Sequence, residues 1–229
     1  MVKKDKKKRI EDWDLYFVTE SGLTPGRSTV DVVREAVEAG VKVVQMREKE
    51  KSARRRFRLG QKLRRITADS GVDFLVNDRV DLALALDADG VHLGQEDLPC
   101  AQARRLLGEE SIIGLSASSP EQALEAEAAG ADYIGLGSIF TTGSKRLEED
   151  RQAIGLESLR RAAADVDIPL VAIGGIDAGN VSRVIEAGAG AAAVITALTR
   201  AEDTAGAAAE MISIIQNSKN HNGRNKDVR

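Results

Sequence analysis

Polar residues at the ends of short apolar segments give this sequence the side chains that phosphate recognition needs. The apolar residues Val43 and Val44 are followed by Gln45, Arg47 and Lys49 at alternate positions. Successive side chains of a strand point to opposite faces, so a strand that continues this far would direct all three to one side. Arginine and lysine neutralise phosphoryl oxygens, and arginine does so through paired hydrogen bonds. The spacing therefore predicts an anion site at the end of this strand.

Other apolar segments end in groups that could complete such a site. The candidates are Asn77 and Asp78, Gln95 to Asp97, Ser116, Thr142, Ser144 and Lys145, Gly174 and Gly175, and Ile195 and Thr196. Glycine loops and helix starts present backbone N–H groups that bind an anion without a charged side chain. The pattern predicts one cationic phosphate site and a second one built from backbone. The alternative for the second is that the glycine pair merely turns the chain and Thr196 caps a helix.

Two of these residues are aspartates, which a bare phosphate would repel. Asp78 and Asp97 make sense if Mg²⁺ lies between them and the ligand, because Mg²⁺ takes a few carboxylates together with phosphate oxygens. The alternative is that Asp78 caps a helix beginning near Arg79 and Asp97 caps one beginning near Pro99. The lysines and arginine at the same strand ends favour the metal site.

The elements that must position these residues alternate regularly along the chain. Strand-like segments occur at 14–19, 41–47, 73–78, 90–94, 112–117, 133–140, 169–175 and 191–197, with helical patterns between them. Strict alternation implies a parallel sheet with right-handed crossovers. About eight such units in roughly 200 residues favour a single-domain (β/α)₈ TIM barrel over an open sheet, and ligands of such barrels bind at the carboxyl ends of the strands. The glycine pair and residues 195–196 then follow the last two strands, where these barrels place a phosphate site.

Composition narrows the class of protein. Lys and Arg number 33 against 36 Asp and Glu, which argues against nucleic acid as a partner. No apolar run approaches the ~20 residues that a membrane span needs. The single cysteine, Cys100, excludes an internal disulfide and fits a reducing compartment, so we expect a cytoplasmic protein. We expect a barrel domain over residues 11–217, a flexible basic tail at 1–10 and a disordered polar tail at 218–229.

Several motifs in this order resemble those of thiamine phosphate synthases: "QMREK", "VNDRVDLALALDADGVHLGQED", "GLSA", "ADYIGLGSIFTTGSK", "VAIGGI" and "VITAL". The resemblance covers nearly the whole chain between the expected tails. Its most specific parts are the Q-x-R-E-K segment and the N-D…H-x-G-Q-E-D pair. That family joins a pyrimidine-methyl diphosphate to a thiazole phosphate and releases pyrophosphate.

The resemblance implies a role for each matching residue. The pyrimidine diphosphate would be bound by Gln45, Met46, Arg47, Glu48, Lys49, Asn77, Ser116 and Lys145, of which Arg47, Lys49, Ser116 and Lys145 would be catalytic. The thiazole phosphate would be bound by Thr142, Gly143, Ser144, Gly175, Ile195 and Thr196. The cofactor Mg²⁺ would be bound by Asp78 and Asp97. Departure of pyrophosphate would leave a cation that the thiazole nitrogen captures, so no nucleophile or strong base is needed.

The sequence departs from the family pattern in two places. The loop Thr141–Lys145 lacks the usual proline and contains Gly143, and Ser118 stands where a histidine is frequent. The acidic residues 146–153 are a candidate lid over the substrates. These departures bear on rate and affinity more than on reaction type.

Three other functions remain open. A thiazole tautomerase of the same superfamily is disfavoured because Ser118 replaces its histidine while Asp78 and Asp97 are both present. A phosphosugar isomerase would explain only the backbone phosphate site, and a non-catalytic thiamine-precursor-binding protein would have little need of the metal set. His92 is expected to be a packed or orienting residue rather than a general base. A homo-oligomer is possible.

Overall fold

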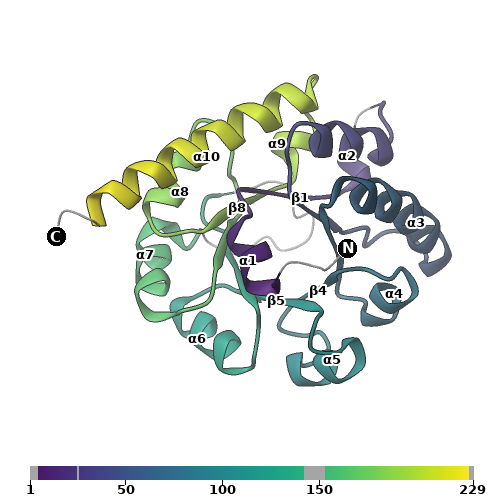
Figure 1. The fold of residues 1–229 in the computed structure, drawn as a ribbon, viewed down its shortest axis with the longest axis horizontal. Coiled ribbons are helices and arrows are strands. Elements are labelled where there is room, and N and C mark those ends of the chain that lie inside the picture. Colours follow the sequence, from purple (N-terminus) through teal and green to yellow (C-terminus); the bar gives the residue numbers. More distant parts are fainter. Residues whose placement is uncertain (1–4, 25, 142–152, 227–229) are drawn as a thin grey trace.

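The computed structural model describes residues 5–24, 26–141 and 153–226 of the chain. Eight parallel strands close into a barrel in which each strand pairs with its neighbours in sequence and β8 pairs with β1 (Figure 1). They are β1 (Leu15–Val18), β2 (Val43–Met46), β3 (Asp73–Asn77), β4 (Gly90–Leu93), β5 (Ile112–Ala117), β6 (Tyr133–Gly137), β7 (Leu170–Ile173) and β8 (Ala191–Val194). The predicted (β/α)₈ barrel is confirmed.

Helices surround the barrel in chain order (Figure 1). They are α2 (Thr29–Glu38), α3 (Ala53–Ser70), α4 (Val80–Ala85), α5 (Cys100–Leu107), α6 (Pro120–Ala128), α7 (Gly155–Asp165), α8 (Val181–Glu186) and α10 (Thr204–Lys226), with short turns at η1 (Ser21–Leu23) and α9 (Thr196–Thr199). A further helix, α1 (Lys6–Glu11), lies across one end of the barrel in this view. None of the helices in the described ranges is both long and apolar enough to cross a lipid bilayer.

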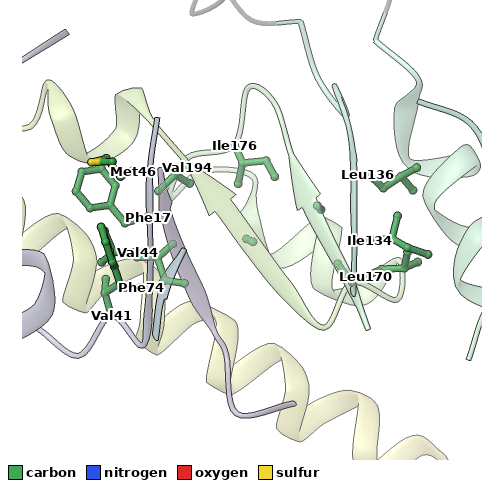
Figure 2. Close-up of a cluster of buried hydrophobic side chains, with 14 of the residues drawn as sticks. Phe17, Val41, Val44, Met46, Phe74, Ile134, Leu136, Leu170, Ile176 and Val194 are labelled. Atoms are coloured by element: carbon green, nitrogen blue, oxygen red, sulfur yellow. The ribbon is translucent and has the colours of Figure 1, made fainter. Parts of the chain in front are cut away.

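Strand side chains alternate between two packed layers. The outward residues meet the helices, and Figure 2 shows part of this layer, including Phe17, Val44, Met46 and Phe74. The inward residues fill the barrel, among them Tyr16, Val43, Leu75, Ile112 and Tyr133. This alternation directs Gln45 inward and Met46 outward, because neighbouring strand residues face opposite sides.

Two inward glycines make room for bulky polar neighbours. A Cβ at Gly114 would lie 2.1 Å from Cζ of Tyr133, and a Cβ at Gly135 would lie 2.8 Å from Cε1 of His92. Both separations are shorter than van der Waals contact, so a larger residue at either position would displace the ring. These glycines therefore allow a tyrosine and a histidine to lie inside the barrel.

The chain ends differ from the two tails expected from sequence. Within residues 1–10, those from Lys6 onward belong to helix α1, whose Ile10 is 3 % exposed. Arg9 forms a salt bridge with Asp73 and lies 3.3 Å from the carboxylate of Asp89. The basic segment is ordered because it meets carboxylates at the amino-terminal end of the barrel.

The expected carboxyl-terminal tail is also helical in the structure. Helix α10 continues to Lys226, and Nζ of Lys219 lies 2.7 Å from Asp14 Oδ1 and donates a hydrogen bond to the carbonyl of Trp13. Residues 218–226 are therefore not a separate disordered segment. Residues 1–4 and 227–229 lie outside the described residues.

Candidate active site

A cavity of about 270 Å³ opens at the carboxyl ends of the strands. Six of the residues predicted to bind substrate line it: Gln45, Arg47, Asn77, Ser116, Gly175 and Ile195. They come from β2, β3, β5 and the segments after β7 and β8, so the barrel brings together positions 150 residues apart in sequence. Of the three residues expected to converge at the end of this strand, Gln45 and Arg47 both line the cavity, whereas Lys49 does not.

Lys49, Asp78 and Asp97 do not line this cavity themselves, but Asp78 directly follows the lining residue Asn77 and Asp97 lies two positions after the lining residue Gln95, so we call this cluster the rim. The Nζ of Lys49 is 3.5 Å from the carboxylate of Asp78. The carboxyl of Asp97 interacts with that of Asp78 and raises its pKa. The two aspartates, which are 19 positions apart in sequence, are thus close enough to share a cation or a proton.

Neither aspartate caps a helix. Helix α4 begins after Arg79 and α5 after Pro99, and neither start receives a hydrogen bond from a capping side chain. Asp97 Oδ2 instead accepts a 2.6 Å hydrogen bond from the backbone N–H of Gly94, which tightens its own loop. The capping alternative considered from the sequence is therefore wrong for both residues.

The surroundings of Asp78 disfavour its charge. Burial raises the pKa of this carboxyl, the hydrogen bond and the charge of Asp97 raise it further, and Lys49 lowers it. The backbone of Asp78 has a φ of 62°, a left-handed conformation that non-glycine residues adopt infrequently. A strained residue that places two carboxylates together is consistent with a cation site, because a divalent cation would remove their mutual repulsion.

The donor set fits magnesium only if the substrate completes it. Within the described ranges, no group of three or more His, Cys, Asp or Glu side chains could hold a metal ion. Mg²⁺ needs few protein ligands, since it usually keeps several waters and binds one or two carboxylates plus substrate phosphates. The pair of aspartates therefore suits Mg²⁺ better than a metal that requires a cage of protein ligands.

Arg47 is held in place by a carboxylate that the sequence reasoning missed. Its guanidinium forms a salt bridge with Glu20, and its backbone N–H donates a 3.1 Å hydrogen bond to Thr19 Oγ1. Burial raises the pKa of Glu20, while the charge of Arg47 lowers it. Glu20 lies in the segment after β1, where only the strand-end rule could have identified it.

The side chains of Met46 and Glu48 do not face the cavity. Met46 packs in the outer layer and is 2 % exposed. The buried carboxylate of Glu48 accepts hydrogen bonds from Thr19 Oγ1 at 3.0 Å and Lys51 Nζ at 2.7 Å. The structure thus separates the "QMREK" segment into alternate residues that face the ligand space and residues that anchor the loop.

The glycine pair after β7 has a conformation and a location that few other residues could occupy. Gly174 and Gly175 have φ values of 104° and 65°. A Cβ on Gly174 would lie 1.9 Å from Ser138 Oγ, and one on Gly175 would lie 2.7 Å from the carbonyl of Thr141. Ile195 borders the cavity and precedes the short helix α9, which begins at Thr196. This is the position at which barrels of this type bind phosphate.

Four predicted residues cannot be placed. Thr142, Gly143, Ser144 and Lys145 lie outside the described residues, as do residues 146–152 of the candidate lid. Ser118 does line the cavity, and its hydroxyl donates a 2.9 Å hydrogen bond to Gln122 Oε1. Its neighbour Gln95 donates a hydrogen bond to the carbonyl of Ser116.

The floor of the cavity contains two tyrosines that were not predicted as site residues. Tyr16 and Tyr133 line it together with His92, and their hydroxyl oxygens are 2.8 Å apart. Both ring nitrogens of His92 have partners, Tyr133 at Nδ1 and Ser116 at Nε2. This agrees with an orienting histidine rather than a general base. Strand alternation was the signal that could have identified the tyrosines, because both occupy inward positions.

Comparisons with known proteins agree with this geometry. The family model described as "Thiamine monophosphate synthase" matches residues 15–198. The chain is 51 % identical over 209 residues to a thiamine-phosphate synthase of Haloarcula marismortui, covering 91 % of this chain and 99 % of the relative. It is 48 % identical over 210 residues to that of Moorella thermoacetica, covering 92 % and 99 %.

A solved structure extends the likeness to three dimensions. Thiamine phosphate pyrophosphorylase from Pyrococcus furiosus superimposes with a TM-score of 0.83 at 43 % sequence identity, covering 92 % of this chain and 98 % of that one. Sequence and structure agree over nearly the whole length of both chains. The chain therefore belongs to the thiamine monophosphate synthase family.

Proposed function

We propose that this protein is a thiamine-phosphate synthase. It would join 4-amino-2-methyl-5-(diphosphooxymethyl)pyrimidine to a thiazole phosphate, giving thiamine phosphate and pyrophosphate. Family membership and the names of the relatives support the reaction type. The observation that carries the assignment is the ion pair of Lys49 with Asp78, whose carboxyl interacts with that of Asp97, next to a cavity that Arg47 lines.

The diphosphate would lie against this cluster. Arg47 borders the cavity and is oriented by its salt bridge with Glu20, so its guanidinium would not have to be ordered again when the ligand binds. Lys49 is 54 % exposed and only 3.5 Å from Asp78, which keeps it near the same site. Both cations would stabilise negative charge as it develops on the leaving pyrophosphate. Lys145 would add a third positive charge.

Asp78 and Asp97 are the residues that would hold Mg²⁺. When bound, the ion would neutralise charge on the departing diphosphate. Lys49 would balance part of the carboxylate charge beside it, because its ammonium group lies within ion-pair distance of Asp78. Their shared position at the rim supports a role at the diphosphate rather than at the floor of the cavity.

The aminopyrimidine ring would lie deeper, above the tyrosines. Gln45 donates an amide N–H to the hydroxyl of Tyr16 at 2.7 Å, so its carbonyl oxygen can accept a hydrogen bond from the exocyclic amine. Asn77 and Ser116 border the same part of the cavity. Met46 and Glu48 would contribute through the backbone and by anchoring their loop.

The thiazole phosphate would bind across the cavity at the segments after β7 and β8. Gly175 and Ile195 would supply backbone N–H groups, a mode of binding that suits a phosphate without a metal, and Thr196 would add its side-chain hydroxyl as a further donor. Thr142, Gly143 and Ser144 would complete this site from the segment after β6. Two unlike anion sites then correspond to two different phosphorylated substrates.

The reaction would proceed by departure of pyrophosphate before the new bond forms. The C–O bond to the diphosphate breaks with both electrons leaving on oxygen, and the aminopyrimidine ring stabilises the resulting methylene cation. The thiazole nitrogen then donates its electron pair to form the C–N bond. The protein's contribution would be to stabilise the leaving group and to align the two rings, which agrees with a site whose floor carries hydrogen bonds but whose rim carries charge.

One assay separates the synthase from its alternatives. The protein is incubated with both phosphorylated precursors and Mg²⁺, and thiamine phosphate and pyrophosphate are quantified. We expect both products in equal amounts. Conversion of the thiazole substrate alone would identify a tautomerase, and tight binding without turnover would identify a precursor-binding protein.

A further inference from the structure

A continuous chain of hydrogen bonds crosses the barrel interior below the cavity. Gln45 Nε2 donates to the Tyr16 hydroxyl at 2.7 Å, and that hydroxyl lies 2.8 Å from the hydroxyl of Tyr133. The Tyr133 hydroxyl lies 2.8 Å from Nδ1 of His92, whose Nε2 lies 2.9 Å from Oγ of Ser116. The chain thus connects Gln45 on β2 with Ser116 on β5, and both ends line the cavity.

The direction of the protons along this chain follows from its first member. The amide nitrogen of Gln45 can only donate, so the oxygen of Tyr16 accepts there. Tyr16 is 1 % exposed and must give its own proton to a buried acceptor, which is the oxygen of Tyr133. Tyr133, with no exposed surface, then gives its proton to Nδ1 of His92.

The same reasoning fixes the last two members. A neutral histidine that accepts at Nδ1 carries its proton on Nε2, which therefore donates to Oγ of Ser116. The Ser116 hydroxyl accepts this bond and keeps its own proton for another partner. Because Ser116 borders the cavity, that proton is available to a ligand.

We propose that Tyr16 and Tyr133 are positioning residues that hold His92 in its Nε2–H tautomer and thereby make Ser116 a hydrogen-bond donor toward the substrate. This consequence for catalysis rests on the proposed function, in which Ser116 contacts the pyrimidine diphosphate. The ligand atom facing Ser116 is then a hydrogen-bond acceptor.

Packing around the two tyrosines holds their hydroxyl groups in position for these hydrogen bonds. The ring of Trp13 contacts Tyr16 and Tyr133 edge to face, with centroid separations of 5.5 Å and 5.1 Å. The open space over Gly114 and Gly135 receives the rings of Tyr133 and His92. Burial also raises the pKa of both tyrosines, so each keeps the proton that the chain requires.

The first test measures the tautomer directly in the ligand-free protein. The chain has 2 histidines, His92 and the exposed His221, so His221→Gln leaves a single imidazole for ¹⁵N NMR. We expect a protonated Nε2 and an unprotonated Nδ1. A proton on Nδ1, alone or together with one on Nε2, would overturn the proposal. Because no substrate is present, this result is independent of whether the protein proves to be a synthase.

The second test removes the proton that reaches the histidine. In Tyr133→Phe we expect the ¹⁵N spectrum to show loss of the single Nε2–H tautomer. We also expect kcat/KM for the diphosphate to fall about tenfold, the effect of one lost hydrogen bond to the site, with little change in KM for the thiazole phosphate. An unchanged tautomer would show that Tyr133 does not set it.

A third test compares two substitutions of His92 and does not depend on the Tyr133 variant. The amide nitrogen of glutamine can take the place of Nε2, whereas that of asparagine lies nearer the position of Nδ1. We therefore expect His92→Gln to retain more activity than His92→Asn. The reverse order would mean that the contact at the Nδ1 position matters more than the one to Ser116, which would contradict the proposal.

Discussion

The two ends of the barrel both gather charged side chains, but the carboxylates at the two ends have different neighbours. At the amino-terminal end, Asp73 accepts hydrogen bonds from Arg9 and from Trp13 Nε1 at 2.9 Å, and Asp89 lies 3.0 Å from Arg64. At the carboxyl end, Asp78 meets another carboxylate, that of Asp97.

The pKa shifts show the same difference. Burial raises the pKa of Asp73, but its neighbours Arg9 and Trp13 lower it. Burial also raises the pKa of Asp78, and there the neighbouring carboxyl of Asp97 raises it further while Lys49 lowers it. A buried carboxylate with donors around it stabilises the fold, whereas two neighbouring carboxylates suit a site that binds a cation. The comparison teaches that two carboxylates beside each other mark a candidate binding site more clearly than a carboxylate surrounded by donors.

The largest effect is expected on stability, at the amino-terminal end of the barrel, where Arg9 meets Asp73 and Asp89. Arg9→Met keeps most of the side-chain volume but leaves the carboxylates of Asp73 and Asp89 without this cation. We expect the free energy of unfolding to fall by about 3 kcal/mol, as for other broken buried ion pairs. Denaturant unfolding measures this loss. A variant with wild-type stability would show that α1 is not needed to close the barrel, and a changed KM at permissive temperature would contradict the separation of the two ends.

At the carboxyl end the expected loss is of activity rather than of stability. Asp78→Ala should lower kcat by about 100-fold, equivalent to about 2.7 kcal/mol of lost electrostatic stabilisation, and weaken the dependence on Mg²⁺. Steady-state kinetics across a magnesium titration measure both effects. Asp81→Asn is the matched control, because Asp81 is exposed and pairs with Arg79 outside the cavity. If the titration is the same for Asp78→Ala and wild type, Asp78 is not part of the site.

A smaller effect is expected at the backbone phosphate site. Thr196→Val keeps the shape of the side chain and should raise KM for the thiazole phosphate about tenfold, with less effect on KM for the diphosphate. The control is Thr199→Val on the same short helix; the buried hydroxyl of Thr199 has no hydrogen-bond partner within the described part of the chain. Equal effects on both substrates would make Thr196 purely structural.

The smallest effect concerns stability against pH in the absence of divalent cations. Since the folded-state pKa of Asp78 is raised, the folded protein binds this proton more tightly than the unfolded chain. The carboxyl's contribution is most favourable below its ordinary pKa and is lost as pH rises through the raised value. Asp78→Asn should therefore stabilise the protein near neutral pH, and this gain should vanish as pH falls below the ordinary value of 3.8. Unfolding curves in chelator measure it; a gain that grows toward acid pH would contradict the sign of the shift.

Local sequence patterns were sufficient to predict the barrel, but they did not predict that helix α1 would lie across its amino-terminal end. The segment 112–117 coincides with β5 because a run of branched residues bounded by turns can only be extended there. Arg9 was assigned to a solvated tail because its partner Asp73 lies 64 positions away and becomes its neighbour only in the folded chain.

The site shows the same limit of sequence reasoning. Gln45, Asn77 and Ser116 could be predicted because each ends a strand. Tyr16 and Tyr133 could not be recognised as one hydrogen-bonded chain, because their meeting depends on the space above Gly114, which belongs to a different strand. Residues 142–145 lie outside the described residues, so the predictions for them stand as predictions.

A crystal grown with Mn²⁺ in place of Mg²⁺ and with pyrophosphate tests most directly whether the carboxylates of Asp78 and Asp97 form the metal site. The anomalous difference map locates the manganese without reference to any assumed chemistry. We expect one strong peak between the carboxylates of Asp78 and Asp97, with pyrophosphate oxygens beside it and beside Arg47 and Lys49. Manganese bound elsewhere, or pyrophosphate bound without any metal between these two aspartates, would contradict the proposal that Asp78 and Asp97 form the metal site.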